Sequence, residues 1–455
     1  MFNALFTKTD EYAKLAQALG FPGACALFGI PGAGRALVYA ALARALEKPL
    51  CIVTPGEAEA TRFAGDLNAL GMAAAVFPAR DYVLRPIEGT AREYEYRRLS
   101  VLGDLVGGRL QAVCVPDEGL TQFTTPRADF CANTRSLHPG DTLPRAELTA
   151  LLYGAGYTRR DQVDGPGQFS IRGDIVDVYA PDMKQPARME FWGDEIDTMH
   201  SFDLATQRRD EPIEKIYVSP SREVLFGAPG DAAALIRATI KKARGKRRTA
   251  LEACTAADLA QLDGGAMPVN MDKYLTLRYP EPATILDYFD DPLLILEEPA
   301  SLREAERATA YRRGEELSAL LEDGALAPGL DKLYAENGWL WTQTATHRTL
   351  CAENFARSMP DVPLKAIVNA PAHTLPTWGG EVAALLEDVQ PLCSGGAAVT
   401  VMAGTSRAAA GLAADLRGKG LRVTTDADAA PSAGMVQVLP GQLSAGCSLP
   451  FAKYA

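Results

Sequence analysis

One glycine-rich stretch, GIPGAGRA starting at Gly29, has the spacing of a phosphate-binding loop without its two reactive side chains. In the motif G-x-x-x-x-G-K-[ST], backbone amides surround the phosphates, the lysine reaches their oxygens and the hydroxyl holds magnesium. Gly29, Gly32 and Gly34 are present, but Arg35 replaces the lysine and Ala36 replaces the hydroxyl residue. Alanine cannot bind magnesium, and a planar guanidinium does not substitute for a compact ammonium. We therefore predict a strand-to-helix turn that does not hydrolyse nucleotides.

A second feature of nucleotide hydrolases is an apolar strand that ends in an acid, and LLILEEP (293–299) has this form. In a working site such a carboxylate holds magnesium beside the phosphate loop. Glu297 and Glu298 can do so only next to a loop that presents phosphate and metal. Because that loop is degenerate here, we interpret them as two carboxylates at a strand terminus.

A possible binding surface lies on the segment ARMEFWGDE. In a strand, alternation places Arg188 and Trp192 on one face, and Met189 and Phe191 on the other. Arginine and tryptophan are enriched among the residues that dominate protein–protein binding. Arg172, on the preceding strand SIRGDIVDVYA, joins the same face if the two strands are antiparallel neighbours. From the residues alone, a protein-binding patch and an ordinary solvated sheet face are both open.

The basic run KKARGKRR (241–248) can bind phosphate groups, but its helical context also fits a solvated helix face or exposed loop. Elsewhere, we find no Ser/His/Asp, Cys/His or paired-carboxylate set whose local spacing identifies catalysis.

Composition narrows the class of protein. A net charge of −11 and a pI near 5.1 argue against nucleic-acid binding by the whole surface. No apolar stretch approaches the length of a membrane span. The eight cysteines are scattered singly and the four histidines lie far apart, which argues against a zinc site or a disulfide framework. We expect a soluble, cytoplasmic protein without a metal, a cofactor or a membrane partner.

The elements that position these residues follow an alternating pattern. Strands and helices alternate over residues 1–126, including a helix over 89–107, which predicts an α/β fold with an open, mostly parallel sheet. A compact α+β insert follows at 127–218. Residues 219–345 return to an α/β texture, and residues 350–455 form a small separate α/β domain. In the insert, two strands are predicted, over 167–181 and 187–196.

Several segments together resemble one family. Residues 167–197, GQFSIRGDIVDVYAPDMKQPARMEFWGDEID, are similar to a segment shared by the excision-repair protein UvrB and the bacterial transcription-repair coupling factors (Mfd). Residues 274–299 and 441–455 resemble the coupling factors specifically. The blocks occur in the order found in that family, so the resemblance covers essentially the whole chain.

The resemblance implies an architecture. Residues 1–126 and 219–345 would form one discontinuous, helicase-like (P-loop or RecA-like) α/β domain with a degenerate nucleotide loop. The insert at 127–218 would be a UvrA-binding domain, and residues 350–455 the small third domain of the family.

It also implies a function. In the family this region is a non-catalytic adaptor that recruits UvrA and links stalled RNA polymerase to nucleotide excision repair. Its UvrA-contacting positions correspond to Arg172, Arg188 and Trp192, although a member of the family has phenylalanine at the last of these.

Longer members continue with an RNA-polymerase-binding domain and a translocase on double-stranded DNA that uses ATP and magnesium. No intact phosphate-loop motif occurs in these 455 residues. We therefore expect an N-terminal fragment of such a protein, not an enzyme by itself. Two alternatives stay open: an active ATPase or helicase domain that uses 29–36 with 297–298, and a DNA-binding module that uses 241–248.

Overall fold

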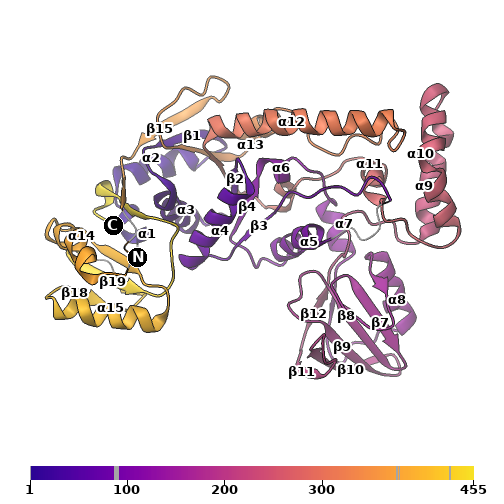
Figure 1. Cartoon of the computed structure of the whole chain (residues 1–455), viewed down its shortest axis with the longest axis horizontal. Helices are drawn as coiled ribbons and strands as arrows, with labels where there is room; N and C mark the ends of the chain where they lie inside the picture. The colour runs from indigo at the N-terminus through magenta and orange to yellow at the C-terminus, as the bar shows by residue number, and fades with distance from the viewer. Residues whose placement is uncertain (1, 87–91, 376–377, 379, 430–431) are drawn as a thin grey trace.

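Seven parallel strands form the central sheet, in the order β15-β1-β14-β13-β2-β4-β3 (Figure 1). The computed structural model describes residues 2–86, 92–375, 378, 380–429 and 432–455. The middle strands are buried throughout and mostly apolar, because helices cover both faces of the sheet. The predicted α/β class is confirmed. The strands are β1 (Gly23–Phe28), β2 (Leu50–Thr54), β3 (Ala74–Val76), β4 (Ala112–Pro116), β13 (Leu293–Glu297), β14 (Arg348–Glu353) and β15 (Leu364–Asn369).

Two hydrophobic cores lie on the two faces of this sheet. One core is formed with α1 (Phe2–Phe6), α2 (Asp10–Leu19), α3 (Gly32–Leu46) and α4 (Glu57–Ala69). The other is formed with α5 (Glu93–Val106), α7 (Arg127–Ala132), α12 (Pro299–Glu322) and α13 (Trp339–Thr346). The helix predicted over 89–107 is α5, and residues 89–91 of that prediction lie outside the described residues. Shorter helices are α6 (Asp117–Leu120) and α11 (Leu275–Arg278), with 3₁₀ turns at Met271–Tyr274, Ile285–Tyr288 and Pro450–Ala452.

The large sheet extends past the domain boundary expected at 345–350. β14 pairs with β1 and β13, and β15 pairs with the other edge of β1. Residues 348–369 therefore complete the large sheet, although the sequence analysis assigned most of them to the small domain. The reason is that an apolar strand pattern does not reveal which sheet the strand will join.

The insert contains a six-stranded sheet in the order β11-β10-β9-β8-β7-β6 (Figure 1). Helix α8 (Arg145–Gly154) packs on one face of it through Leu148 and Leu152, which share a core with Phe169, Met189 and Phe191. A separate two-stranded sheet pairs β5 (Arg135–Leu137) with β12 (Ile216–Val218). The six strands are β6 (Thr158–Arg159), β7 (Gln168–Arg172), β8 (Ile175–Tyr179), β9 (Ala187–Trp192), β10 (Glu195–Phe202) and β11 (Arg209–Pro212).

The single strand predicted over 167–181 is wrong. It is a hairpin of β7 and β8, in which Arg172 pairs with Ile175 across a tight turn at Gly173 and Asp174. Gly173 has φ +60°, a left-handed conformation that glycine adopts without steric cost. As a consequence β8 lies between β7 and β9.

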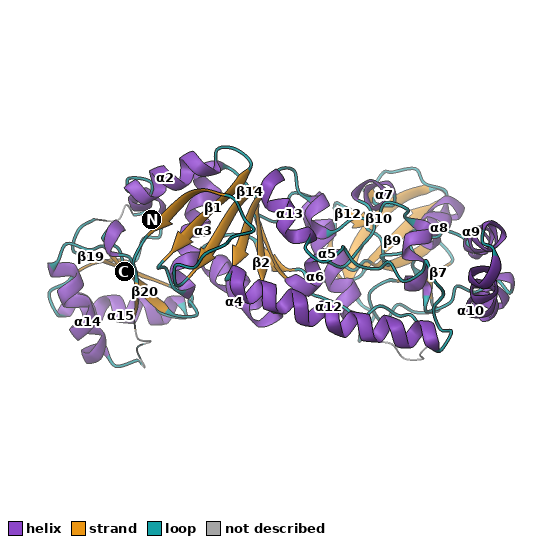
Figure 2. Cartoon of the chain, turned by 90° about the horizontal axis from the view of Figure 1, so that it is seen from above, coloured by secondary structure: helices purple, strands orange, loops and turns teal. Residues whose placement is uncertain are grey.

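Beyond the insert, α9 (Pro229–Lys242) and α10 (Gly245–Asp263) form a helical hairpin at one end of the molecule. Helix α12 extends from the central sheet toward this end, along the long axis of the molecule (Figures 1 and 2). The small domain lies at the opposite end and has a parallel sheet in the order β17-β19-β18. Residues 376–377, 379 and 430–431 of this expected domain lie outside the described residues. Its elements are β16 (His373–Leu375), α14 (Val382–Ser394), β17 (Val399–Met402), α15 (Ser406–Gly418), β18 (Arg422–Thr424), β19 (Met435–Leu439) and β20 (Gly446–Ser448).

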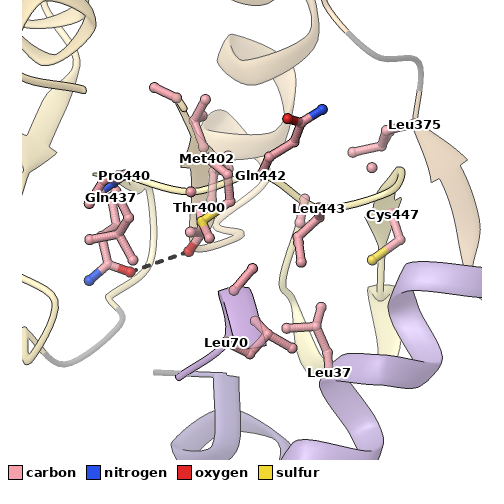
Figure 3. Close-up of a pocket in the computed structure, with 18 of the residues that line it drawn as sticks. Leu37, Leu70, Leu375, Thr400, Met402, Gln437, Pro440, Gln442, Leu443 and Cys447 are labelled. Carbon is pink, nitrogen blue, oxygen red and sulfur yellow. Dashed lines mark hydrogen bonds between the residues drawn. The ribbon is translucent and has the colours of Figure 1, made fainter. Parts of the chain in front are cut away.

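A cavity of 1020 Å³ separates α3 from the small domain. Leu37 and Leu70 line it from the large domain, and Met402 and Leu443 line it from the small one (Figure 3). The segments that follow β17, β18 and β19 all border this cavity. Within the part of the chain that the structure describes, none of the helices has the length and apolar character needed to cross a bilayer.

Buried charges hold the segment that follows the insert against the large domain. Glu223 is fully buried and accepts hydrogen bonds from Arg80 Nε (3.0 Å) and from Arg98 Nε (2.7 Å) and Nη2 (3.2 Å). Asp272 binds the other side of Arg80 through both carboxylate oxygens. Burial alone would raise the pKa of Glu223, but Arg80 and Arg98 lower it below its ordinary value. These contacts join segments that precede and follow the insert.

A buried acid at the end of β4 makes stability depend on pH. Burial raises the pKa of Asp117 from 3.8 to about 7, and Glu306 adds to the shift. The folded chain therefore holds a proton that the unfolded chain loses, and this stabilising contribution disappears as pH rises from about 4 to 7.

We predict that the Asp117→Asn variant, whose side chain stays neutral, does not lose this contribution to the unfolding free energy as pH rises. Between pH 5 and pH 8 the parent should lose on the order of 2 kcal/mol more unfolding free energy than the variant, as measured by urea unfolding. Identical pH profiles for the two proteins would contradict the assignment.

Candidate functional site

The outer face of the six-stranded sheet brings two of the predicted site residues onto one carboxylate. Arg172 donates from Nη2 to Asp177 Oδ2 (2.6 Å). Arg188 donates from Nε to Asp177 Oδ1 (2.7 Å) and from Nη2 to Oδ2 (2.9 Å). Ser170 Oγ adds a longer hydrogen bond of 3.4 Å to Oδ2. The Asp177 side chain has no exposed surface, since the two guanidiniums cover it.

Strand order explains this arrangement. Asp177 lies on β8, opposite Ser170 of β7 and Arg188 of β9, while Arg172 is the last residue of β7. Asp177 was not predicted as part of the site, because a single strand was expected over 167–181 where the chain forms the β7–β8 hairpin. The available signal was an acid between two valines on an alternating strand, which places a charge on the face opposite the apolar side chains.

The two arginines are held differently. Arg188 also donates from Nη1 to the Gln207 carbonyl (3.1 Å) and stacks on the ring of Phe202 at 4.6 Å, so only 12% of its side chain is exposed. The hydrogen bonds that Arg188 donates to Asp177 raise the pKa of Arg188 above its ordinary value. Arg172 is 44% exposed and is anchored through Nη2, which leaves other N–H groups facing solvent. We conclude that Arg172 is the accessible cation and that Arg188 supports it.

Trp192 ends the same face. Along β9, Arg188, Glu190 and Trp192 alternate with Met189 and Phe191, which are buried as predicted. Trp192 is 83% exposed, more than any other large apolar side chain in the described residues. Glu190, between Arg188 and Trp192, forms an ion pair with Arg209 of β11. The structure thus places the three predicted residues on one face, with the arginines joined through Asp177 and the indole at the end of the strand.

The degenerate loop lies between β1 and α3, and Gly32 is the first residue of that helix. Arg35 is 5% exposed and forms ion pairs with both Glu297 and Glu298. It also donates from Nε to the Ile30 carbonyl at 2.7 Å. The hydroxyl of Tyr39 donates to the other oxygen of Glu297.

This cluster connects two features that the sequence analysis treated separately. The cation at the lysine position pairs with both acids at the end of β13, and its contact with Glu297 joins residues 262 positions apart in the chain. Burial raises the pKa of Glu297, while Arg35 and the Tyr39 hydroxyl oppose that shift. Gly34 is required by packing, since a Cβ there would lie 2.8 Å from Ile30 Cγ2. The cation that a bound phosphate would need is therefore already paired with protein carboxylates.

The basic run 241–248 covers the end of α9, the turn and the start of α10, and contributes no residue to the outer sheet face.

Among the described residues, no group of three or more His, Cys, Asp or Glu side chains has a geometry that could hold a metal ion.

We predict that Arg35→Leu destabilises the chain by about 3–5 kcal/mol, because it leaves Glu297 buried without a countercharge. Urea unfolding at pH 7 measures the change. The double variant Arg35→Leu/Glu297→Leu should recover most of the loss, since a buried ion pair can be replaced by apolar packing at little cost. A loss below about 1 kcal/mol in the single variant, typical of a solvent-screened ion pair, would contradict this role.

Comparisons with known proteins agree with these features. Residues 136–224 match the family model described as the UvrB interaction domain, and this segment includes Arg172, Asp177, Arg188 and Trp192. A transcription-repair-coupling factor of Bacillus subtilis is 26% identical over 446 residues, which cover 94% of this chain and 37% of that protein. One from Mycobacterium tuberculosis is 37% identical over 186 residues (39% of this chain, 15% of that protein). One from Myxococcus xanthus is 32% identical over 209 residues (44% and 17%).

The chain spans about a third of the length of the relatives that match most of it. The resemblance predicted from the sequence is confirmed: the chain is similar to transcription-repair-coupling factors over most of its length and carries a segment that matches the UvrB interaction domain.

Proposed function

We propose that this chain is a non-catalytic adaptor that binds UvrA through the outer face of its six-stranded sheet. The observation that carries the proposal is the position of Arg172, Asp177, Arg188 and Trp192. All four lie inside the segment that matches the UvrB interaction domain, on the sheet face opposite the α8 core. This face is open to solvent and offers a cation and a large aromatic ring.

The geometry supports binding by preorganisation. Asp177 holds the guanidinium of Arg172 in one orientation, so less side-chain freedom is lost when a partner carboxylate binds it. Trp192 supplies a large apolar contact area that has to leave water. The partner surface that fits is an acidic group next to an apolar pocket. Arg188 acts mainly through Asp177 and is a positioning residue.

The wider role follows from the relatives. We propose that the chain supplies the UvrA-recruiting part of a longer cytoplasmic coupling factor. That protein would use ATP and magnesium to translocate on double-stranded DNA, displace stalled RNA polymerase and start nucleotide excision repair. On this proposal the large sheet is a helicase-like domain whose nucleotide site has closed.

The Arg35 cluster supports the absence of catalysis in this chain, because the cation at the lysine position is already paired with two carboxylates. ATP turnover by the purified chain that disappears in Glu298→Gln would contradict this part of the proposal and favour the ATPase alternative, since Glu298 is the partly exposed acid of the cluster.

Titration of UvrA into the chain by calorimetry tests the docking surface. Arg172→Ala should weaken binding by about 2–4 kcal/mol, as should Trp192→Ala, because each removes a central anchor. Trp192→Phe should keep most of the affinity, since an aromatic anchor remains. Arg135→Ala is the matched control: this exposed arginine lies in the separate β5–β12 sheet of the insert. Unchanged affinity in Arg172→Ala/Arg188→Ala would refute the surface.

A double-mutant cycle tests the positioning role of Asp177. Asp177→Asn should reduce the affinity for UvrA by about tenfold when Arg172 is present, and should have little further effect in the Arg172→Ala background. Urea unfolding of each variant separates lost binding from lost folding. Equal losses in both backgrounds would show that Asp177 does not act through Arg172.

A further inference from the structure

The α9–α10 hairpin carries a local charge opposite to that of the protein. Residues 232–251 contain seven Lys and Arg residues and no Asp or Glu, although the whole chain has a net charge of −11. The hairpin lies at the end of the molecule opposite the small domain (Figure 1). Its cations are Arg237, Lys241, Lys242, Arg244, Lys246, Arg247 and Arg248.

Most of this charge is uncompensated at the turn. Arg237 pairs with Asp263 (2.6 Å) and Arg248 pairs with Glu252 (2.8 Å). Arg247 donates from Nε to the Pro328 carbonyl at 3.0 Å, which ties the turn to the rest of the chain. Among the described residues, no carboxylate lies within 4.0 Å of the charged nitrogens of the remaining four cations, all of which are exposed: Lys241, Lys242, Arg244 and Lys246.

Helix stability accounts for only some of these residues. Lys241 and Lys242 are favourable at the carboxyl end of α9, but Lys246, Arg247 and Arg248 lie in the first turn of α10. Cations there oppose the helix dipole, which favours acids at an amino-terminal end. Their side chains are exposed and bury little apolar surface. The cations at the start of α10 that oppose its dipole are explained by an anionic partner.

The composition of the hairpin selects the kind of partner. Neither α9 nor α10 contains an aromatic residue, so the hairpin has no platform on which single-stranded bases could stack. The turn also lacks the large apolar or aromatic side chains that anchor protein interfaces. What remains is a group of long cations of the kind that contacts backbone phosphates without reading bases.

We propose that the turn between α9 and α10 is a second interaction surface, which binds the phosphate backbone of duplex DNA without sequence preference. It is separate from the outer face of the six-stranded sheet and does not depend on UvrA binding. Because the rest of the surface is acidic, binding is confined to this turn and is weak and strongly salt-dependent.

Fluorescence anisotropy of a labelled DNA duplex of about 20 base pairs, titrated with the 455-residue chain over a series of KCl concentrations, tests the proposal. The test variant is Lys241→Gln/Lys242→Gln/Arg244→Gln/Lys246→Gln, which spares Arg247 and Arg248 because they make structural contacts. Glutamine retains helix propensity. The slope of log affinity against log salt should become shallower by about three to four, and affinity at low salt should fall at least 100-fold.

The matched control neutralises four exposed cations elsewhere: Lys14, Lys184, Arg407 and Lys419, each changed to Gln. It has the same net charge as the test variant and should bind the duplex nearly as well as the parent. Equal losses in the two variants would overturn the proposal, as would tighter binding to a single strand of the same length. Absence of duplex binding at 50 mM KCl, with polyglutamate binding instead, would assign the turn to an acidic protein.

Discussion

A buried carboxylate held between two guanidiniums is the interaction on which this structure depends. Glu223, with Arg80 and Arg98, fixes the point where the chain returns from the insert to the large domain. A charge is costly to remove from water unless its partners are buried with it, and here both partners of Glu223 come from the segment that precedes the insert, while Glu223 follows it. The insert is therefore set at a defined position on the large sheet.

Two further ion clusters differ in how deeply they are buried. This difference distinguishes the scaffold from the proposed binding surface. At Arg35 the cation is buried and paired with two acids, so it is not available to a phosphate group. At Asp177 the cluster is only half covered, so Arg188 is nearly buried while Arg172 keeps donors in solvent. The same kind of ion cluster thus buries the cation of the degenerate loop at Arg35 and leaves a guanidinium exposed at Arg172.

Two surfaces result, and they differ in physical character. The outer sheet face combines one ordered cation with an exposed indole, which suits a specific protein contact. The α9–α10 turn has several unpaired flexible cations and no aromatic ring, which suits a polyanion bound through its charge. They are formed by different segments of the chain and share no residue.

The sequence by itself determined the features that depend on near neighbours. Glycine spacing and the missing lysine identified a degenerate loop. Strand alternation predicted that Met189 and Phe191 are buried and that Trp192 lies on the opposite face. The alternation of strands and helices predicted the α/β class. Tertiary structure decided whatever depends on pairing between distant segments. Only the folded chain joins Arg35 to Glu297, places Asp177 between two arginines and adds β14 and β15 to the large sheet. The reason is that periodicity encodes which side of an element is buried, whereas the partner of a buried charge or strand edge is set by topology.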